Sequence, residues 1–340
     1  MTSPASERLD LREPRRNFTA DEILAEHPYD RPLVVAGITC HGGFLGGEYV
    51  SPRTLCRVPA IEAWQSRLPR GELEQVLDPI SACIPPHFPS SAQTRMLVRN
   101  GVTVPLVRIL TLIAMVEGYG GEVIRLVPVP PLARRIREPI EGTALAHLGA
   151  LFEAHARDEA GHRSMWELAR DIALDHPAIP ADLASSLAPP PPTRLLPEIP
   201  ADLEALVLRM LGVLTIEVFA AEAFRWACEV LGDLELFARG EEATRLIERI
   251  RQDEAPHVAY LATALAELRC RSLTADSGDA IPLREVIDRA RDMVVALQTG
   301  PRHEANVAFR TQVVERCLAG HPRRDAILAD FRSLGATTPA

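Results

Sequence analysis

The chain has 340 residues, of which 47% are hydrophobic and 24% charged, so general disorder is excluded and a sizeable core is expected. The net charge of −9 argues against a nucleic-acid partner. The most apolar stretch, 102–116, contains Pro105 and Arg108, and no run of about 18 uncharged apolar residues predicts a membrane span. Without an apolar signal region or a Cys-x-x-Cys pair among its six cysteines, the chain is expected to be cytoplasmic, with no disulfide framework or zinc ribbon.

Lysine is absent from the sequence, so all 37 cationic side chains are arginines. This excludes a Schiff-base lysine, a phosphate-loop lysine and a kinase-type lysine. Chemistry must therefore come from carboxylates, histidines, thiols, hydroxyls or a cofactor.

The first hundred residues are rich in proline and glycine and predict short elements joined by loops. Residues 37–47 hold five glycines but lack the Gly-Lys-Ser/Thr of a phosphate loop. We interpret them as a turn-rich segment, with a ligand-covering loop as the alternative. A short helix is expected near 58–68, with Pro59 in its first turn.

Long helices are predicted where proline is sparse and the apolar residues recur with helical spacing. Four such segments are 104–127, 139–174, 201–231 and 241–273, and two more helices are expected at 281–297 and 304–334. The prolines at 189–192 predict a rigid spacer. Since no alternating strand pattern stands out, the fold class is all-α, divided into a loop-rich segment (1–100), a helical core (101–275) and C-terminal helices (276–340).

An internal repeat runs through the four long helices. Residues 117–125 (EGYGGEVIR) match 217–225 (EVFAAEAFR) in both glutamates and the arginine, and 158–162 (DEAGH) match 253–257 (DEAPH). The core is thus two copies of a helix pair, each a glutamate helix followed by an Asp-Glu-x-x-His helix.

The spacing within this repeat indicates metal binding. A glutamate and a histidine three residues apart lie on one helix face, so Glu159 with His162, and Glu254 with His257, can each bind one ion. Carboxylate oxygens combined with a few imidazoles suit iron or manganese. We further expect Asp158 and Asp253 to accept the N–H of the histidine on the partner helix and so to fix its tautomer.

The doubled Asp-Glu-x-x-His with upstream glutamates resembles the ferritin-like di-iron oxygenases, including bacterial di-iron hydroxylases and the p-aminobenzoate N-oxygenase type. The resemblance covers about 104–270 and implies a ferritin-like four-helix bundle with additional N- and C-terminal helices and loops. In that family the upstream glutamate lies some thirty-odd residues before the motif. That spacing favours Glu122 and Glu222, which lie 37 and 32 residues before their motifs, over Glu117 and Glu217. The implied ligands are Glu122, Glu159, His162, Glu222, Glu254 and His257.

His155 lies four residues before Glu159, on the same helix face, whereas Ile250 stands at the equivalent position in the second copy. The N-oxygenase type carries an extra histidine at this position, but in its other copy. We therefore name His155 as a catalytic residue, and leave open whether it is a seventh ligand or a histidine of a neighbouring pocket. Tyr260 is interpreted as part of the core or of a pocket wall.

The expected function is O2-dependent oxygenation of a small organic substrate, by hydroxylation or N-oxygenation, at two iron ions, with Mn/Fe as an alternative. Because no flavin or nicotinamide motif occurs, electrons must come from an external reductase or reductant. An apolar pocket is expected beside the metals. The alternatives are a ferroxidase, iron-storage or peroxide-scavenging protein, and a metal-free helical scaffold. The oligomeric state is open, a homodimer included.

Overall fold

The computed structural model describes residues 17–85, 88–126, 128–174, 179, 194–275 and 278–336. The chain is mostly helical, as predicted, and four long helices lie in the predicted segments, although the one expected to begin at residue 139 begins at Leu148. They are α5 (Val104–Leu126), α7 (Leu148–Ala173), α8 (Ala201–Leu231) and α9 (Gly240–Arg269). The predicted spacer at 189–192 lies outside the described residues.

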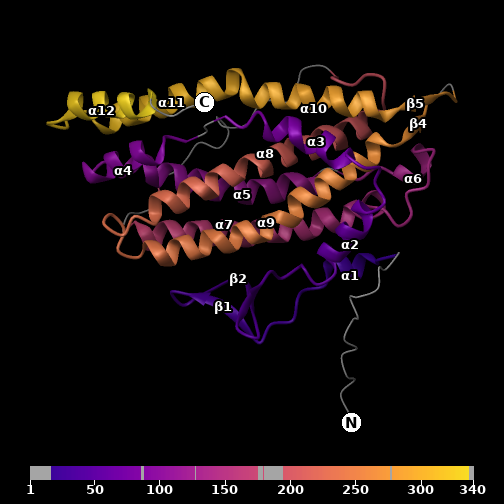
Figure 1. Ribbon diagram of the computed structural model, residues 1–340, viewed down its shortest axis with the longest axis horizontal. Coiled ribbons are helices and arrows are strands. Elements are labelled where there is room, and N and C mark those ends of the chain that lie inside the picture. The colour runs from indigo at the N-terminus through magenta and orange to yellow at the C-terminus, as the bar shows by residue number, and fades with distance from the viewer. Residues whose placement is uncertain are drawn as a thin grey trace, which may run out of the picture.

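The four long helices pack side by side in the middle of the molecule (Figure 1). Helix α7 packs against both α5 and α9, and α8 packs mainly against α9. Their buried apolar side chains form two large clusters, one reaching Phe152 and Tyr260 and the other reaching Met165 and Ile250. The histidines and carboxylates of the repeat occupy the turns between these two clusters, so apolar packing encloses them from both ends.

Helix α5 is long and apolar enough, by length and composition, to cross a membrane. The core helix of a soluble protein has the same properties, and α5 packs closely along α7. Gly121 permits this contact, because a methyl group there would lie 2.9 Å from Glu159 Cβ and 3.0 Å from the Ala156 carbonyl oxygen.

The N-terminal segment contains a sheet that the sequence did not predict. Strands β1 (Arg31–Val35), β2 (Ile38–Leu45) and β3 (Glu48–Val50) form an antiparallel sheet in that order. The glycine-rich segment is therefore largely strand, and it escaped notice because glycines interrupt the alternation of apolar and polar side chains. Gly46 and Gly47, with φ of +59° and +90°, form the turn between β2 and β3.

The remaining elements surround the four-helix core. In Figure 1 the sheet lies on one side of the core, while α10, α11 and α12 run along the opposite side. The predicted helix 304–334 is in fact two helices, separated by a turn at Gly320, whose φ is +81°. The surrounding elements are α1 (Ala20–Leu24), α2 (Arg57–Gln65), α3 (Glu72–Ser81), α4 (Ser91–Arg99), α6 (Leu132–Arg135), η1 (Ala144–His147), β4 (Ser272–Thr274), β5 (Ala280–Pro282), α10 (Leu283–Thr299), α11 (Pro301–Cys317) and α12 (Arg324–Ala336).

Candidate metal centre

Two groups of histidine and glutamate side chains meet between the four long helices, and they share Glu159. Within each group the potential ligand atoms all lie within 4.8 Å of one another. Group one consists of His155, Glu159, Glu217 and His257, and group two of Glu117, Glu159, His162 and Glu254.

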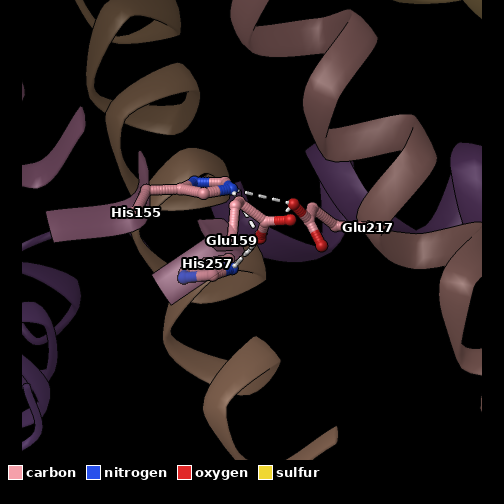
Figure 2. A group of neighbouring side chains, drawn as sticks. All are labelled: His155, Glu159, Glu217 and His257. Carbon is pink, nitrogen blue, oxygen red and sulfur yellow. Dashed lines mark ion pairs between the residues drawn. The ribbon is translucent and has the colours of Figure 1, made fainter. Parts of the chain in front are cut away.

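Group one is drawn in Figure 2, where both histidines face the carboxylates of Glu159 and Glu217. His155 Nε2 lies 3.0 Å from Glu217 Oε1 and 3.3 Å from Glu159 Oε1. His257 Nδ1 also lies 3.3 Å from Glu159 Oε1. The two imidazole rings are stacked, with centroids 3.7 Å apart and planes 8° from parallel. Two nitrogens therefore approach the same carboxylate from adjacent positions.

Group two is built around His162, whose Nδ1 lies 2.7 Å from Glu254 Oε1 and 3.9 Å from Glu117 Oε2. The buried Trp166 orients Glu117 by donating its indole N–H to Oε1 at 3.1 Å. The other oxygen of Glu254 lies 2.6 Å from His257 Nδ1, in group one. Glu254 thus spans both groups, as Glu159 does.

The predicted contacts of the motif aspartates with the histidines of the partner helix are present. His257 Nε2 lies 3.1 Å from Asp158 Oδ2 on the partner helix, and His162 Nε2 lies 3.4 Å from Asp253 Oδ2. When each Nε2 donates its proton to an aspartate, the lone pair of Nδ1 remains free and faces the glutamates. The crossed hydrogen bonds therefore prepare both motif histidines to bind a cation through Nδ1.

Several buried atoms of the cluster have no hydrogen-bond partner among the described residues. They include Glu159 Oε1, Glu254 Oε1 and His162 Nδ1, although the last two are only 2.7 Å apart. Buried polar atoms normally find a partner, and atoms about 3 Å apart are also neighbouring ligands of one ion bound at about 2.1 Å. The four glutamates would balance two divalent cations. The residues present therefore fit a dinuclear metal centre.

The electrostatics indicate the same need for cations. Burial, together with the charge of Glu254, raises the pKa of Glu217 to about 7. Burial and the charge of Glu159 also raise the pKa of Glu117 well above its usual range. Burial would raise the pKa of Glu254 too, but the adjacent His162 lowers it to about 2. Without metal, the carboxylates depend on protons and on the histidines to offset their mutual repulsion.

The expected upstream ligands are corrected. Glu122 is exposed on α5, and Glu222, with 38% of its side chain exposed, forms an ion pair with Arg225 three residues later. Neither joins the two groups. Glu117 and Glu217, five residues earlier and about 140° around the helix, point inward instead. The repeat matches both pairs equally well, and so could not choose between them.

His155 lies inside the cluster, not on the wall of a neighbouring pocket. Its Nδ1 lies 2.9 Å from the Tyr260 hydroxyl, which leaves Nε2 directed at the glutamates. This placement fits a seventh ligand, and group one would then hold two nitrogens where group two holds one. Tyr260 is buried in the core, one of the two places that the sequence allows for it. Its position three residues after His257 also places it on the same helix face as that histidine.

Four residues from the N-terminal segment were missed entirely. Asp158 accepts hydrogen bonds from His41 at 3.0 Å, from Arg53 at 3.4 Å and from Arg57. Asp253 accepts one from Tyr49 at 3.1 Å. The only signal in the sequence was the lone histidine within the glycine-rich segment.

The expected apolar pocket beside the metals is not among the two best-defined hollows in the described part of the chain. The larger, with a volume of about 530 Å3, is lined by residues that include Leu195, Ile281 and Arg289. The other, of about 480 Å3, lies against α11 near Gln312 and Arg316. Neither hollow is lined by a residue of the cluster.

The comparisons with known proteins add no further assignment. No protein-family model, no curated protein and no solved structure matches the chain significantly. The interpretation of the cluster therefore depends on its own geometry.

Proposed function

We propose that the chain is a ferritin-like di-iron protein that oxygenates a small organic substrate with O2. The observation that carries this proposal is the pair of histidine and glutamate groups sharing Glu159, with a third histidine, His155, in one of them. Mixed imidazole and carboxylate donors without thiolate suit iron, with Mn/Fe as the alternative pair.

In this assignment, Glu217, His155 and His257 would hold one ion, and Glu117 and His162 would hold the other. Glu159 and Glu254 could contribute to both sites, since each approaches histidines of both groups. The bound iron would supply the redox chemistry that activates O2. The protein residues fix the ligand tautomers, keep bulk water out and leave one ion with fewer nitrogen ligands.

Monooxygenation consumes O2, two electrons and two protons for each substrate molecule, and releases one oxygen atom as water. The electrons are expected to come from an external reductase or a small reductant, because the sequence contains no flavin or nicotinamide motif. The inequality of the two groups supports an oxygenase, because group two would hold its ion with fewer histidine nitrogens than group one.

A ferroxidase is the second candidate, and one observation favours it: neither hollow lies beside the cluster. Such a protein would oxidise Fe(II) repeatedly and release the product, without an organic substrate.

Counting iron and O2 separates the two candidates without knowledge of the substrate. Metal-free protein receives 2, 10 and 50 equivalents of Fe(II) under anaerobic conditions and is then exposed to O2, with absorbance and O2 uptake recorded. An oxygenase should stop after about two Fe(II) per chain, and further O2 uptake should require an added reductant. Continued oxidation at 50 equivalents would favour a ferroxidase, and protein that binds no iron would contradict both.

A further inference from the structure

The three-stranded sheet makes direct contact with the polar layer of the helical core. Strand β2 lies against α7, and its His41 side chain reaches Asp158, with Nε2 3.0 Å from Oδ1. The same nitrogen lies 3.8 Å from Asp253 Oδ2. The His41 ring also packs edge-on against the His162 ring, with centroids 5.6 Å apart.

Strand β3 supplies a second donor. The Tyr49 hydroxyl donates to Asp253, 3.1 Å from Oδ2 and 3.3 Å from Oδ1. The sheet therefore gives one hydrogen bond to each motif aspartate, and each aspartate in turn accepts from one motif histidine. His41 acts through Asp158 on His257, and Tyr49 acts through Asp253 on His162.

Glycines make this approach sterically feasible. A methyl group on Gly161 would lie 2.6 Å from His41 Cβ, so any side chain there would push the strand away. Gly42 has a φ of +81°, and a methyl group on it would lie 2.6 Å from the Tyr49 ring. The second copy of the motif has Pro256 where the first has Gly161.

We propose that this sheet is a cap whose docking is coupled to metal binding, with His41 and Tyr49 as positioning residues for the two motif histidines. The inference rests on the proposed dinuclear centre. Metal binding requires each Nδ1 lone pair to face the glutamates, and the cap holds the aspartates that enforce this tautomer. Metal therefore favours the docked sheet, and the docked sheet favours metal by the same factor.

His41, His162 and Asp253 also lie close enough together to share an ion. In the proposed arrangement, His41 is nevertheless a hydrogen-bond donor to Asp158 and not a ligand of a third ion. Its Nε2 is at hydrogen-bonding distance from Asp158, while the Nε2 of His162 is itself directed at Asp253. An ion bound among His41, His162 and Asp253 would have to displace that proton from His162.

The test uses Mn(II), which binds such ligands without reacting rapidly with O2. Free Mn(II) is measured by electron paramagnetic resonance during titration of the full chain, and hydrogen exchange of 38–45 is followed with and without Mn(II). His41→Ala should weaken Mn(II) binding about 10–100-fold and abolish the slowing of exchange that Mn(II) causes in the wild type. Tyr49→Phe should have a smaller effect of the same kind.

Two further variants keep the result interpretable. Gly161→Ala retains His41 but displaces it, and should reproduce the His41→Ala result. Thr39→Ala, at an exposed position on the same strand, should match the wild type.

A His41→Ala protein that binds two Mn(II) with unchanged affinity would overturn the cap while leaving the dinuclear centre intact. Wild-type protein that binds no Mn(II) would contradict the centre itself, and with it the cap. Three ions in the wild type and two in His41→Ala would make His41 a ligand and overturn its positioning role.

Discussion

Asp158, in the first copy of the repeat, accepts hydrogen bonds from Arg57, Arg53 and His41, whereas Asp253, in the second copy, accepts from Tyr49 and has no arginine partner among the described residues. Two buried guanidinium groups thus face Asp158, whereas no guanidinium group of the described residues faces Asp253. Although burial raises the pKa of Asp158, Arg57 and the histidines hold it well below its usual range. The carboxylate that orients His257 is consequently held by two guanidinium groups, whereas the carboxylate that orients His162 is held by the Tyr49 hydroxyl.

The ligands show the same inequality. The first copy contributes His155, Glu159 and His162 from one helix, while the second has Ile250 at the position equivalent to His155. Ile250 is buried in an apolar cluster instead of facing the glutamates. The repeat therefore defines a nearly symmetric arrangement of histidines and carboxylates, and departures from the repeat make the two groups chemically different.

The largest effect is expected from Glu159, because its Oε1 lies within 3.7 Å of three histidine nitrogens. Glu159→Ala should reduce metal content from two ions per chain to at most one, measured by elemental analysis after loading with Fe(II) or Mn(II). The stabilisation of the wild type by metal, about 2.7 kcal/mol at a hundredfold excess over Kd, should largely disappear. Glu122→Ala is the control and should retain both ions. If Glu122→Ala lost as much metal as Glu159→Ala, the choice of Glu117 over Glu122 as the upstream residue would be contradicted.

The comparison of the two aspartates is tested in metal-free protein by urea unfolding. Asp158→Asn leaves Arg57 buried without its carboxylate partner and should lower the free energy of unfolding by about 3–5 kcal/mol. Asp253→Asn leaves no arginine of the described residues without its carboxylate partner and should lower the free energy of unfolding by about 1–3 kcal/mol.

A double variant separates charge from packing. Replacing Asp158 by Asn together with Arg57→Met removes both members of the pair, and should recover part of the stability lost in Asp158→Asn. If both aspartate variants lose the same stability, the arginines do not distinguish the two copies.

His155 provides a third test, directed at one ion. His155 Nε2 faces Glu217 and Glu159, so His155→Ala should weaken the binding of one of the two ions about a hundredfold. Loss of a hydrogen-bond partner behind a metal ligand costs up to about the same factor in metal affinity. This corresponds to about 2.8 kcal/mol. Tyr260→Phe keeps the His155 imidazole and removes only the hydroxyl that lies next to its Nδ1, so the binding of the same ion should be weakened by a smaller factor. Unchanged affinity for both ions, with reduced turnover, would instead place His155 beside the substrate.

The sequence was sufficient for the existence of the four long helices and for the meeting of the motif residues, because both depend on local periodicity. Helix 201–231 is observed as predicted, and Glu159, His162, Glu254 and His257 meet as the repeat indicated. For the upstream glutamates we relied on a family spacing. The better signal was local: Arg225, three residues after Glu222, already indicated an ion pair on an exposed face.

The contribution of the N-terminal segment could not have been predicted in this way. His41 lies 117 residues before Asp158, and no periodicity within 37–47 relates the two. Their contact depends on Gly161, whose role becomes visible only when the strand lies against α7. A long-range docking contact of this kind leaves no pattern in a single sequence, except a glycine in an otherwise good helix.

The smallest effect is expected at the position where α5 has Gly121 and α8 has Ala221. Gly121 and Ala221 are equivalent in the repeat, but Gly121 is buried against α7 while Ala221 is exposed. Gly121→Ala should lower the free energy of unfolding by about 1–2 kcal/mol, because its methyl group must displace the backbone of α7 near Ala156. It should also weaken metal binding, since Glu159 lies at the same contact. Ala221→Gly should cost about 1 kcal/mol through helix propensity alone and leave metal binding unchanged. The decisive measurement is the Mn(II) affinity of the two variants: if Gly121→Ala binds as tightly as Ala221→Gly, the close approach of α5 to α7 serves packing only.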